Sequence, residues 1–328
     1  MRKMINDPSD VALESLQGFE LTYPELVRVQ YHPQVVIRKD APVAGKVSVI
    51  SGSGSGHEPL NVGYVGKGML DAACPGAVFT SPTPDQLLAA TQAVYGGCGA
   101  LYVIKNYAGG VLNAEMALEL TQEEGFLARS VFIRDDVSTD EVENRRGMGA
   151  AIFVEKIAGA AAEAGLSLDE VTSVATRASE QSRSMGVAVS SCTSPSVGHP
   201  TFSLPGNEME VGVGIHGEQG RYRRPLTNAS EIAEIVLGPI VSDLELCGGE
   251  NVLVMVSGLG ASPRQEINII YRYVHKLLTE RGIVVQRQLV GNYITSLDMA
   301  GCTITVMRLD DELLELWDAP VNTPTLRW

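Results

Sequence analysis

Two histidines that follow glycine-rich stretches are the side chains in this sequence most suited to chemistry. His57 directly follows the run SGSGSG at 51–56, and His216 lies in the stretch GVGIHGE. An imidazole titrates near neutrality, so it can move a proton or, when neutral, add to a carbonyl carbon. Glycines leave backbone N–H groups bare, and these can approach a small polar ligand. The competing interpretation of the first stretch is a flexible turn with a surface histidine.

The strands that we predict just before the polar residues indicate which of these residues come together. An apolar run at 47–50 predicts a short strand that stops at Ser51 and leads into a glycine and serine loop. Two more predicted strands end near Ser81 and at Lys105. Strands and helices alternate here, which predicts an α/β protein with mostly parallel sheets, and ligands of such sheets lie at the carboxyl ends of the strands. We therefore expect the stretch 54–57, Ser81 and Lys105 to converge on one small-molecule site.

The pattern of residue types changes near residue 186, and a second set of predicted strands and helices follows. We predict two α/β domains: 1–184 with the glycine and serine loop and His57, and 185–328 with His216. The glycines of 212–217 fit the spacing GxGxxG, but we expect them inside a strand rather than at a strand–helix turn. The pattern is therefore not interpreted as a dinucleotide site. Residues 8–30 are predicted to form one or two short helices.

Composition excludes several classes of function. The formal net charge of −14 argues against nucleic acid and anionic membranes as partners, because both require basic patches. Five scattered cysteines without a CxxC pair indicate reduced thiols, and the N-terminus lacks the apolar core of a signal peptide, so we predict a cytoplasmic protein. Neither histidine has a third ligand at zinc-site spacing, so no metal site is predicted.

Several longer strings carry a resemblance to a known family. They are SGSGSGHEP, GYVGKGMLDAACPGAVFTSPTPDQ, IKNYAGG, RRGMG, NEMEVGVGIHGE, SGLGASP, NYITSLDM and LWDAPVNTPTLRW. In this order they resemble the dihydroxyacetone kinase K-domain family over essentially the whole chain. The resemblance implies the substrate-binding K subunit of a glycerone-kinase-type phosphotransferase. It also implies the DhaK-type fold of two α/β domains and assembly as a homodimer.

The same resemblance implies roles for individual residues. Members of the family bind a short ketose, typically dihydroxyacetone, as a covalent hemiaminal on a histidine that matches His216, which excludes glycerol. His57 matches a catalytic histidine that assists proton transfer. The residues that match substrate contacts are Gly54, Ser55, Gly56, His57, Ser81 and Lys105. Attachment to the histidine would fix the hydroxyl that receives the phosphoryl group and reduce the entropic cost of the encounter.

A partner is implied as well. The nucleotide-binding L domain of the family has no counterpart in these 328 residues. The expectation is that this chain binds no cofactor itself and that a separate L-type subunit holds Mg-ATP, or Mg-ADP that a phosphotransferase-system protein rephosphorylates. Magnesium neutralises phosphate charge during such a transfer.

One position departs from the family pattern. After IKNY the family normally carries an aspartate that contacts the reacting hydroxyl, and here that position is Gly110. A general base typically contributes about 10²- to 10⁴-fold to a rate. Three hypotheses follow: a larger substrate such as a four-carbon ketose or a keto acid, another base such as His57 or a neighbouring carboxylate, or a paralogue that binds ketose and signals to a transcriptional regulator without phosphorylating it.

Overall fold

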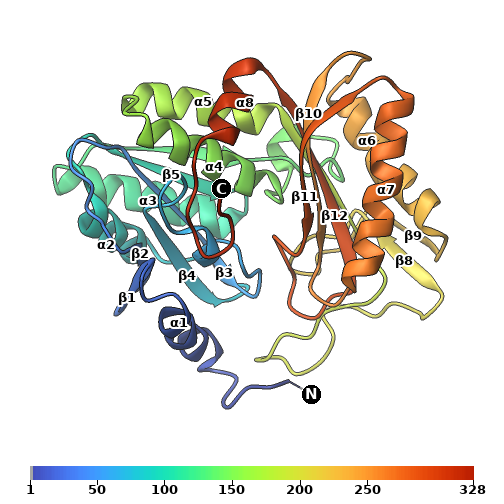
Figure 1. The fold of residues 1–328 in the computed structure, drawn as a ribbon. Helices are drawn as coiled ribbons and strands as arrows, with labels where there is room; N and C mark the ends of the chain where they lie inside the picture. Colours follow the sequence, from blue (N-terminus) through green and yellow to red (C-terminus); the bar gives the residue numbers. More distant parts are fainter. Residues whose placement is uncertain (1–2) are drawn as a thin grey trace. The chain divides into compact units, whose positions relative to one another are not determined.

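The computed structural model describes residues 3–328 as two compact units, each treated by itself (Figure 1). Of the described residues, the first unit comprises 3–133, then Ala151–Ser179 and Leu313–Trp328. The second unit comprises Arg134–Ala150 and Glu180–Glu312. The chain thus divides at other places than the single boundary predicted near residue 184. The difference arises because helices after residue 150 and the last residues of the chain pack back onto the first unit.

The first unit is built on one mixed sheet with the strand order β1-β2-β4-β3-β5-β6. The strands are β1 (Val27–Tyr31), β2 (Gln34–Arg38), β3 (Ser48–Ser55), β4 (Ala72–Val78), β5 (Ala100–Lys105) and β6 (Ala128–Ile133). Strands β4, β3, β5 and β6 run parallel to one another, whereas β1 and β2 form an antiparallel pair and β2 joins β4 in antiparallel orientation. Residues 27–30, which were predicted to be helical, are therefore part of a strand, and α1 (Val11–Thr22) ends before them.

Helices cover this sheet on both faces. The remaining elements of the unit are η1 (Val62–Tyr64), α2 (Pro84–Val94), α3 (Ala108–Glu123), α4 (Ala150–Glu163), α5 (Leu168–Glu180) and α8 (Asp311–Asp318), some of which cross the unit boundary at their ends. Apolar side chains of α2 and α3 pack with Ile50 and Tyr102 in one core cluster. The helix α4 supplies Glu155 to the other face, where Ser51 also points.

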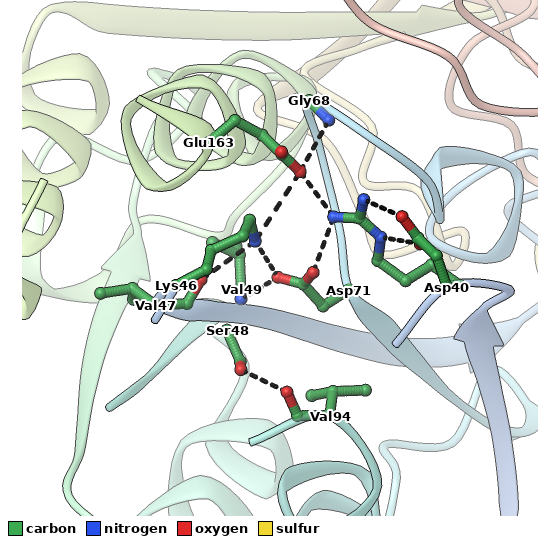
Figure 2. Close-up of polar contacts among 10 residues, drawn as sticks. Asp40, Lys46, Val47, Ser48, Val49, Gly68, Asp71, Val94 and Glu163 are labelled. Carbon is green, nitrogen blue, oxygen red and sulfur yellow. Dashed lines mark hydrogen bonds and ion pairs between the residues drawn. The ribbon is translucent and has the colours of Figure 1, made fainter. Parts of the chain in front are cut away.

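A cluster of buried charges secures the beginning of β3 (Figure 2). Asp71 accepts hydrogen bonds from Lys46 Nζ at 2.6 Å, Arg38 Nη1 at 2.9 Å and Val49 N at 2.8 Å. Glu163 of α4 accepts a hydrogen bond from Arg38 Nη1 at 2.5 Å. Each of these charges has an opposite charge beside it, which is what makes burial of ionised groups tolerable. The cluster lies at the amino end of β3, so we assign it a structural role.

The second unit also contains a mixed sheet, with the order β11-β10-β12-β7-β8-β9. Its elements are η2 (Val142–Asn144), β7 (Ser182–Ala188), β8 (Glu208–Val211), β9 (Tyr222–Pro225), α6 (Ala229–Asp243), β10 (Asn251–Gly258), α7 (Arg264–Glu280), β11 (Val284–Gly291) and β12 (Gly301–Leu309). Helices α6 and α7 share an apolar core with this sheet and lie along it (Figure 1).

The predicted α/β class is confirmed, but the prediction of mostly parallel strands is wrong for the second sheet. Only β10 and β11 pair in parallel there, and the other neighbours in this described sheet are antiparallel. Strand direction depends on how distant segments connect, so the pattern within each strand does not reveal it. Within residues 3–328, no helix is long and apolar enough to cross a membrane.

Candidate functional site

The glycine and serine run is a strand, not the loop that the sequence predicted. Strand β3 continues through Ser55 and is buried along its whole length. Because side chains alternate across a strand, Ser51, Ser53 and Ser55 share one face and the glycines between them share the other. The serine hydroxyls are used internally: Ser51 donates to Val103 O at 2.7 Å and Ser55 to Gly76 O at 2.7 Å.

The glycines of β3 allow the chain's own backbone to come close. A Cβ at Gly54 would lie 2.4 Å from Thr80 N, and one at Gly52 would lie 2.7 Å from Cys74 O. A larger residue at Gly54 would push the segment after β4 away from the sheet, and one at Gly52 would push against β4 itself. This close approach brings Thr80 and the following Ser81 to the end of β3.

His57 follows β3 and is fully buried. Its ring stacks on Phe79 with the centroids 5.0 Å apart and the planes inclined by 17°. The preceding Gly56 has a φ of 104°, a conformation that favours glycine, and its N–H donates to the carboxylate of Glu58 at 2.9 and 3.1 Å. The loop is therefore shaped by glycine geometry and by the carboxylate of Glu58, which was not among the predicted site residues.

Ser81, Lys105 and Gly110 lie together at the start of α3. A Cβ at Gly110 would be 3.5 Å from both Ser81 Oγ and Lys105 O, which is ordinary contact distance. Lys105 ends β5 and is buried, with 5% of its surface exposed. In the sheet, β3 lies between β4 and β5, so the ends of these three strands are neighbours, as the sequence predicted.

His216 lies in the second unit, in a turn after β8 rather than at the end of a strand. Its Nδ1 is 2.9 Å from Glu218 Oε1, and its backbone N–H donates to Glu218 Oε2 at 2.9 Å. A carboxylate only accepts hydrogen bonds, so this geometry places a ring proton on Nδ1. The side chain of His216 is 19% exposed.

A second charge supports Glu218. A Cβ at Gly214 would lie 2.1 Å from Glu218 Oε2 and 2.7 Å from Arg146 Nη1, so glycine makes room for both groups. Arg146 is in turn held by Asp136 at 2.7 Å and by Ser138. Burial acts to raise the pKa of Glu218, but the hydrogen bond with His216 and the charges of His216 and Arg146 outweigh it and lower this pKa to about 2. Glu218 is therefore a carboxylate at neutral pH.

The structure places the predicted residues in two groups. Those of the first unit are Gly54, Ser55, Gly56, His57, Ser81 and Lys105, and His216 belongs to the second unit. Sequence reasoning missed Glu218 and Arg146 as partners of the imidazole. A signal for Glu218 was present, since it stands two residues after His216. Arg146 carried no local signal, because its contact to this turn arises only from the fold.

Comparisons with known proteins agree on one family. The model of the Dak1 domain matches residues 17–325. The PEP-dependent dihydroxyacetone kinase, dihydroxyacetone-binding subunit DhaK, of Escherichia coli (strain K12) is 42% identical over 100% of this chain and 99% of that protein. L-erythrulose kinase of Pectobacterium atrosepticum is 37% identical over 100% of this chain and 56% of its own length. The solved structure of the dihydroxyacetone kinase operon co-activator Dha-DhaQ has a TM-score of 0.89 and 31% identity, covering 96% of this chain and 97% of that one.

Proposed function

Since a Dak1 domain spans residues 17–325, the chain belongs to the Dak1 domain family, and we propose that it is the ketose-binding subunit of a dihydroxyacetone-kinase-type phosphotransferase. The similar DhaK subunit of Escherichia coli is named as dihydroxyacetone-binding, which supports a short ketose as the ligand. The observation that carries the proposal is the hydrogen bond between His216 Nδ1 and Glu218, because it prepares the other ring nitrogen for attack on a carbonyl carbon.

The attachment step follows from this geometry. Nε2 of His216 adds to the ketone carbon and the C=O π pair moves to oxygen. That oxygen takes up a proton from water, and the ring loses its Nδ1 proton, which gives the neutral hemiaminal. The ionised Glu218 stabilises the positive charge that develops on the ring and can receive the Nδ1 proton. Glycerol has no carbonyl carbon, so the site discriminates against it chemically.

The polar groups of the first unit have proposed roles of their own toward a ketose. Lys105 and Ser81 hydrogen-bond its hydroxyl groups, together with the backbone of 54–56, and His57 accepts the proton of the hydroxyl that is phosphorylated. Resemblance to the family supports these assignments. The phosphoryl donor, as Mg-ATP or as Mg-ADP recharged by a phosphotransferase-system protein, is proposed to reside on an L-type partner. We also propose that the chain itself is cytoplasmic and forms a homodimer.

Gly110 favours a second candidate. Without the family's aspartate, the chain can be a ketose sensor that acts on a transcriptional regulator, and its structural similarity to the co-activator Dha-DhaQ supports that alternative. The likeness to L-erythrulose kinase supports a four-carbon ketose within the kinase interpretation.

Two measurements test these proposals. Native mass spectrometry of the wild-type chain with dihydroxyacetone or erythrulose is expected to show an adduct, and His216→Ala is expected to abolish it. An adduct that persists in His216→Ala would overturn the attachment site. Mixing the chain with a nucleotide-loaded L subunit, Mg²⁺ and each ketose is then expected to yield ketose phosphate. Ketose binding without turnover on any substrate identifies the sensor.

A further inference from the structure

Glu155 is a fully buried carboxylate inside the first unit, on helix α4. Its Oε1 accepts a hydrogen bond from Asn61 Nδ2 at 2.6 Å. Its Oε2 is buried and has no hydrogen-bond partner within residues 3–328. An ionised carboxylate is costly to bury unless a positive charge or several donors compensate it. Its retention at this depth therefore calls for a functional explanation.

The surroundings of Glu155 connect it to the serine face of β3. Asn61 donates to Ser51 Oγ at 2.9 Å and accepts from Ser53 Oγ at 2.6 Å. Ser51 bonds the neighbouring strand β5 through Val103 O, two residues before Lys105. Because residues 103 and 105 are two apart on a strand, their side chains point to the same face of the sheet as Ser51. Glu155 thus lies on the face toward which Lys105 points.

Lys105 shares this face of the sheet, and its positive charge acts on the carboxylate. Burial raises the pKa of Glu155 above its usual value, while Ser51, Asn61 and the positive charge of Lys105 act to lower it. Electrostatic coupling is reciprocal, so a negative charge on Glu155 also favours the protonated form of Lys105. A buried lysine without such a charge tends to lose its proton.

We propose that Glu155 is a positioning residue that keeps Lys105 protonated and oriented as a hydrogen-bond donor to a ketose hydroxyl group. The inference rests on the proposed function in so far as it assigns Lys105 to the ketose. A neutral amine is a weaker donor than an ammonium group, and hydrogen bonds to charged groups are the stronger ones. Glu155 affects the substrate through Lys105, without contacting it.

The same helix offers a structural counterexample. Glu163 stands about two turns further along α4 and belongs to the charge cluster at the beginning of β3 (Figure 2). Its Oε1 accepts hydrogen bonds from Arg38 and from Gly68 N. Asp71 in that cluster accepts hydrogen bonds through both of its oxygens. Glu163 is therefore paired directly with a cation, Arg38, whereas the buried Oε2 of Glu155 has no hydrogen-bond partner in the part of the chain that the structure describes.

The test compares Glu155→Gln with Glu163→Gln in the full chain. Glutamine keeps the volume of Glu155 and an oxygen that can accept from Asn61, so it removes little besides the charge. We expect Glu155→Gln to lower the pKa of Lys105 by about one unit or more, measured by NMR of ¹⁵N-lysine side chains assigned with Lys105→Met. With an L-type partner, KM for ketose should rise about 10- to 100-fold while kcat changes less. Glu163→Gln should lower Tm and leave both values unchanged.

The outcomes separate the two proposals. A Glu155→Gln protein with an unchanged Lys105 pKa overturns the inference, whatever happens to Tm. A lowered Lys105 pKa with unchanged KM overturns the link to the ketose. If Glu155→Gln does not fold, Lys105→Met provides the reciprocal test: the pKa of Glu155, followed by ¹³C NMR of its carboxyl carbon, should rise, and an unchanged value overturns the coupling. The NMR titrations need no ketose, so they remain decisive even if the wild-type chain forms no adduct and the proposed function fails.

Discussion

Replacing Glu218 with glutamine should weaken ketose attachment to His216 while leaving the fold intact. The carboxylate accepts two hydrogen bonds from one residue, the Nδ1 and the backbone N–H of His216, both at 2.9 Å. An amide has a single acceptor oxygen, so Glu218→Gln satisfies one of these donors, and its NH₂ group can reverse the ring tautomer by donating to Nδ1. Loss of one charge-assisted hydrogen bond costs about 1.5–3 kcal/mol.

That cost corresponds to a decrease of about 10- to 150-fold in the equilibrium constant for adduct formation. The assay is ¹³C NMR with dihydroxyacetone labelled at the ketone carbon, because this carbon becomes tetrahedral in the hemiaminal. At pH 7 the wild-type carboxylate is ionised, since the pKa of Glu218 is lowered to about 2. A group with a lowered pKa stabilises the folded state fully above its unfolded value of 4.5, and this stabilisation is lost as the pH falls toward 2.

Glu231→Gln is the matched control for this experiment. Glu231 is also a carboxylate of the second unit, but it pairs with Arg224 at 2.6 Å and accepts from Thr227 at the start of α6. The Glu231→Gln substitution should leave the equilibrium constant for adduct formation unchanged. If Glu218→Gln forms the adduct as completely as the wild type, Glu218 does not prepare the imidazole and the reasoning from the ring tautomer is refuted.

Three further substitutions test other parts of the structure. Gly110→Asp should fold, because its Cβ would meet only ordinary contacts at 3.5 Å. An acidic residue in the first turn of α3 should stabilise the folded protein by about 0.3–1 kcal/mol. Thermal unfolding measures this effect, and a marked fall in Tm contradicts it. In the reconstituted kinase, a large gain in dihydroxyacetone turnover by the same variant would indicate that the wild type is specialised for another substrate. Gly54→Ala should lower the free energy of unfolding in urea by about 1–3 kcal/mol, because its Cβ would lie 2.4 Å from Thr80 N. A variant as stable as the wild type would show that the segment after β4 moves aside at little cost. Asp71→Asn should lower the free energy of unfolding by about 3–5 kcal/mol, because it removes the charged partner of buried Lys46 and Arg38. The fraction of folded molecules that form the adduct should not change. A loss of adduct in the folded variant would show that the cluster is more than structural.

The part of the site that lies at strand ends was predictable from the sequence. Apolar runs that end in polar residues indicate where strands stop, and parallel strands bring their carboxyl ends to one edge. Ser81 and Lys105 were found in this way. The run SGSGSG was predicted to be a loop because glycine and serine are common in turns. Its alternation has the period of a strand, however, and the buried faces on both sides of β3 decide for the strand.

The residues that support the site were not predictable from local patterns. Glu155 stands beside Lys156 in an apolar helical run, where two neighbouring charges indicate the exposed edge of a buried helix. Its contact with Asn61 joins residues 94 positions apart, and no spacing rule reports such a pair. The antiparallel order of the second sheet was missed for the same reason, since β12 and β7 are neighbours only through the fold.

The way the chain passes between its two units has a consequence for biosynthesis. Leu313–Trp328 returns to the unit that the first strands begin, where Trp317 packs edge-on against Phe153 at 5.5 Å and Lys156 Nζ donates to Leu316 O. The sheet that is translated first therefore gains these packing partners only after the intervening second unit, Glu180–Glu312, has been translated. No single cut of the gene releases either unit intact, so the two cannot be exchanged as independent cassettes.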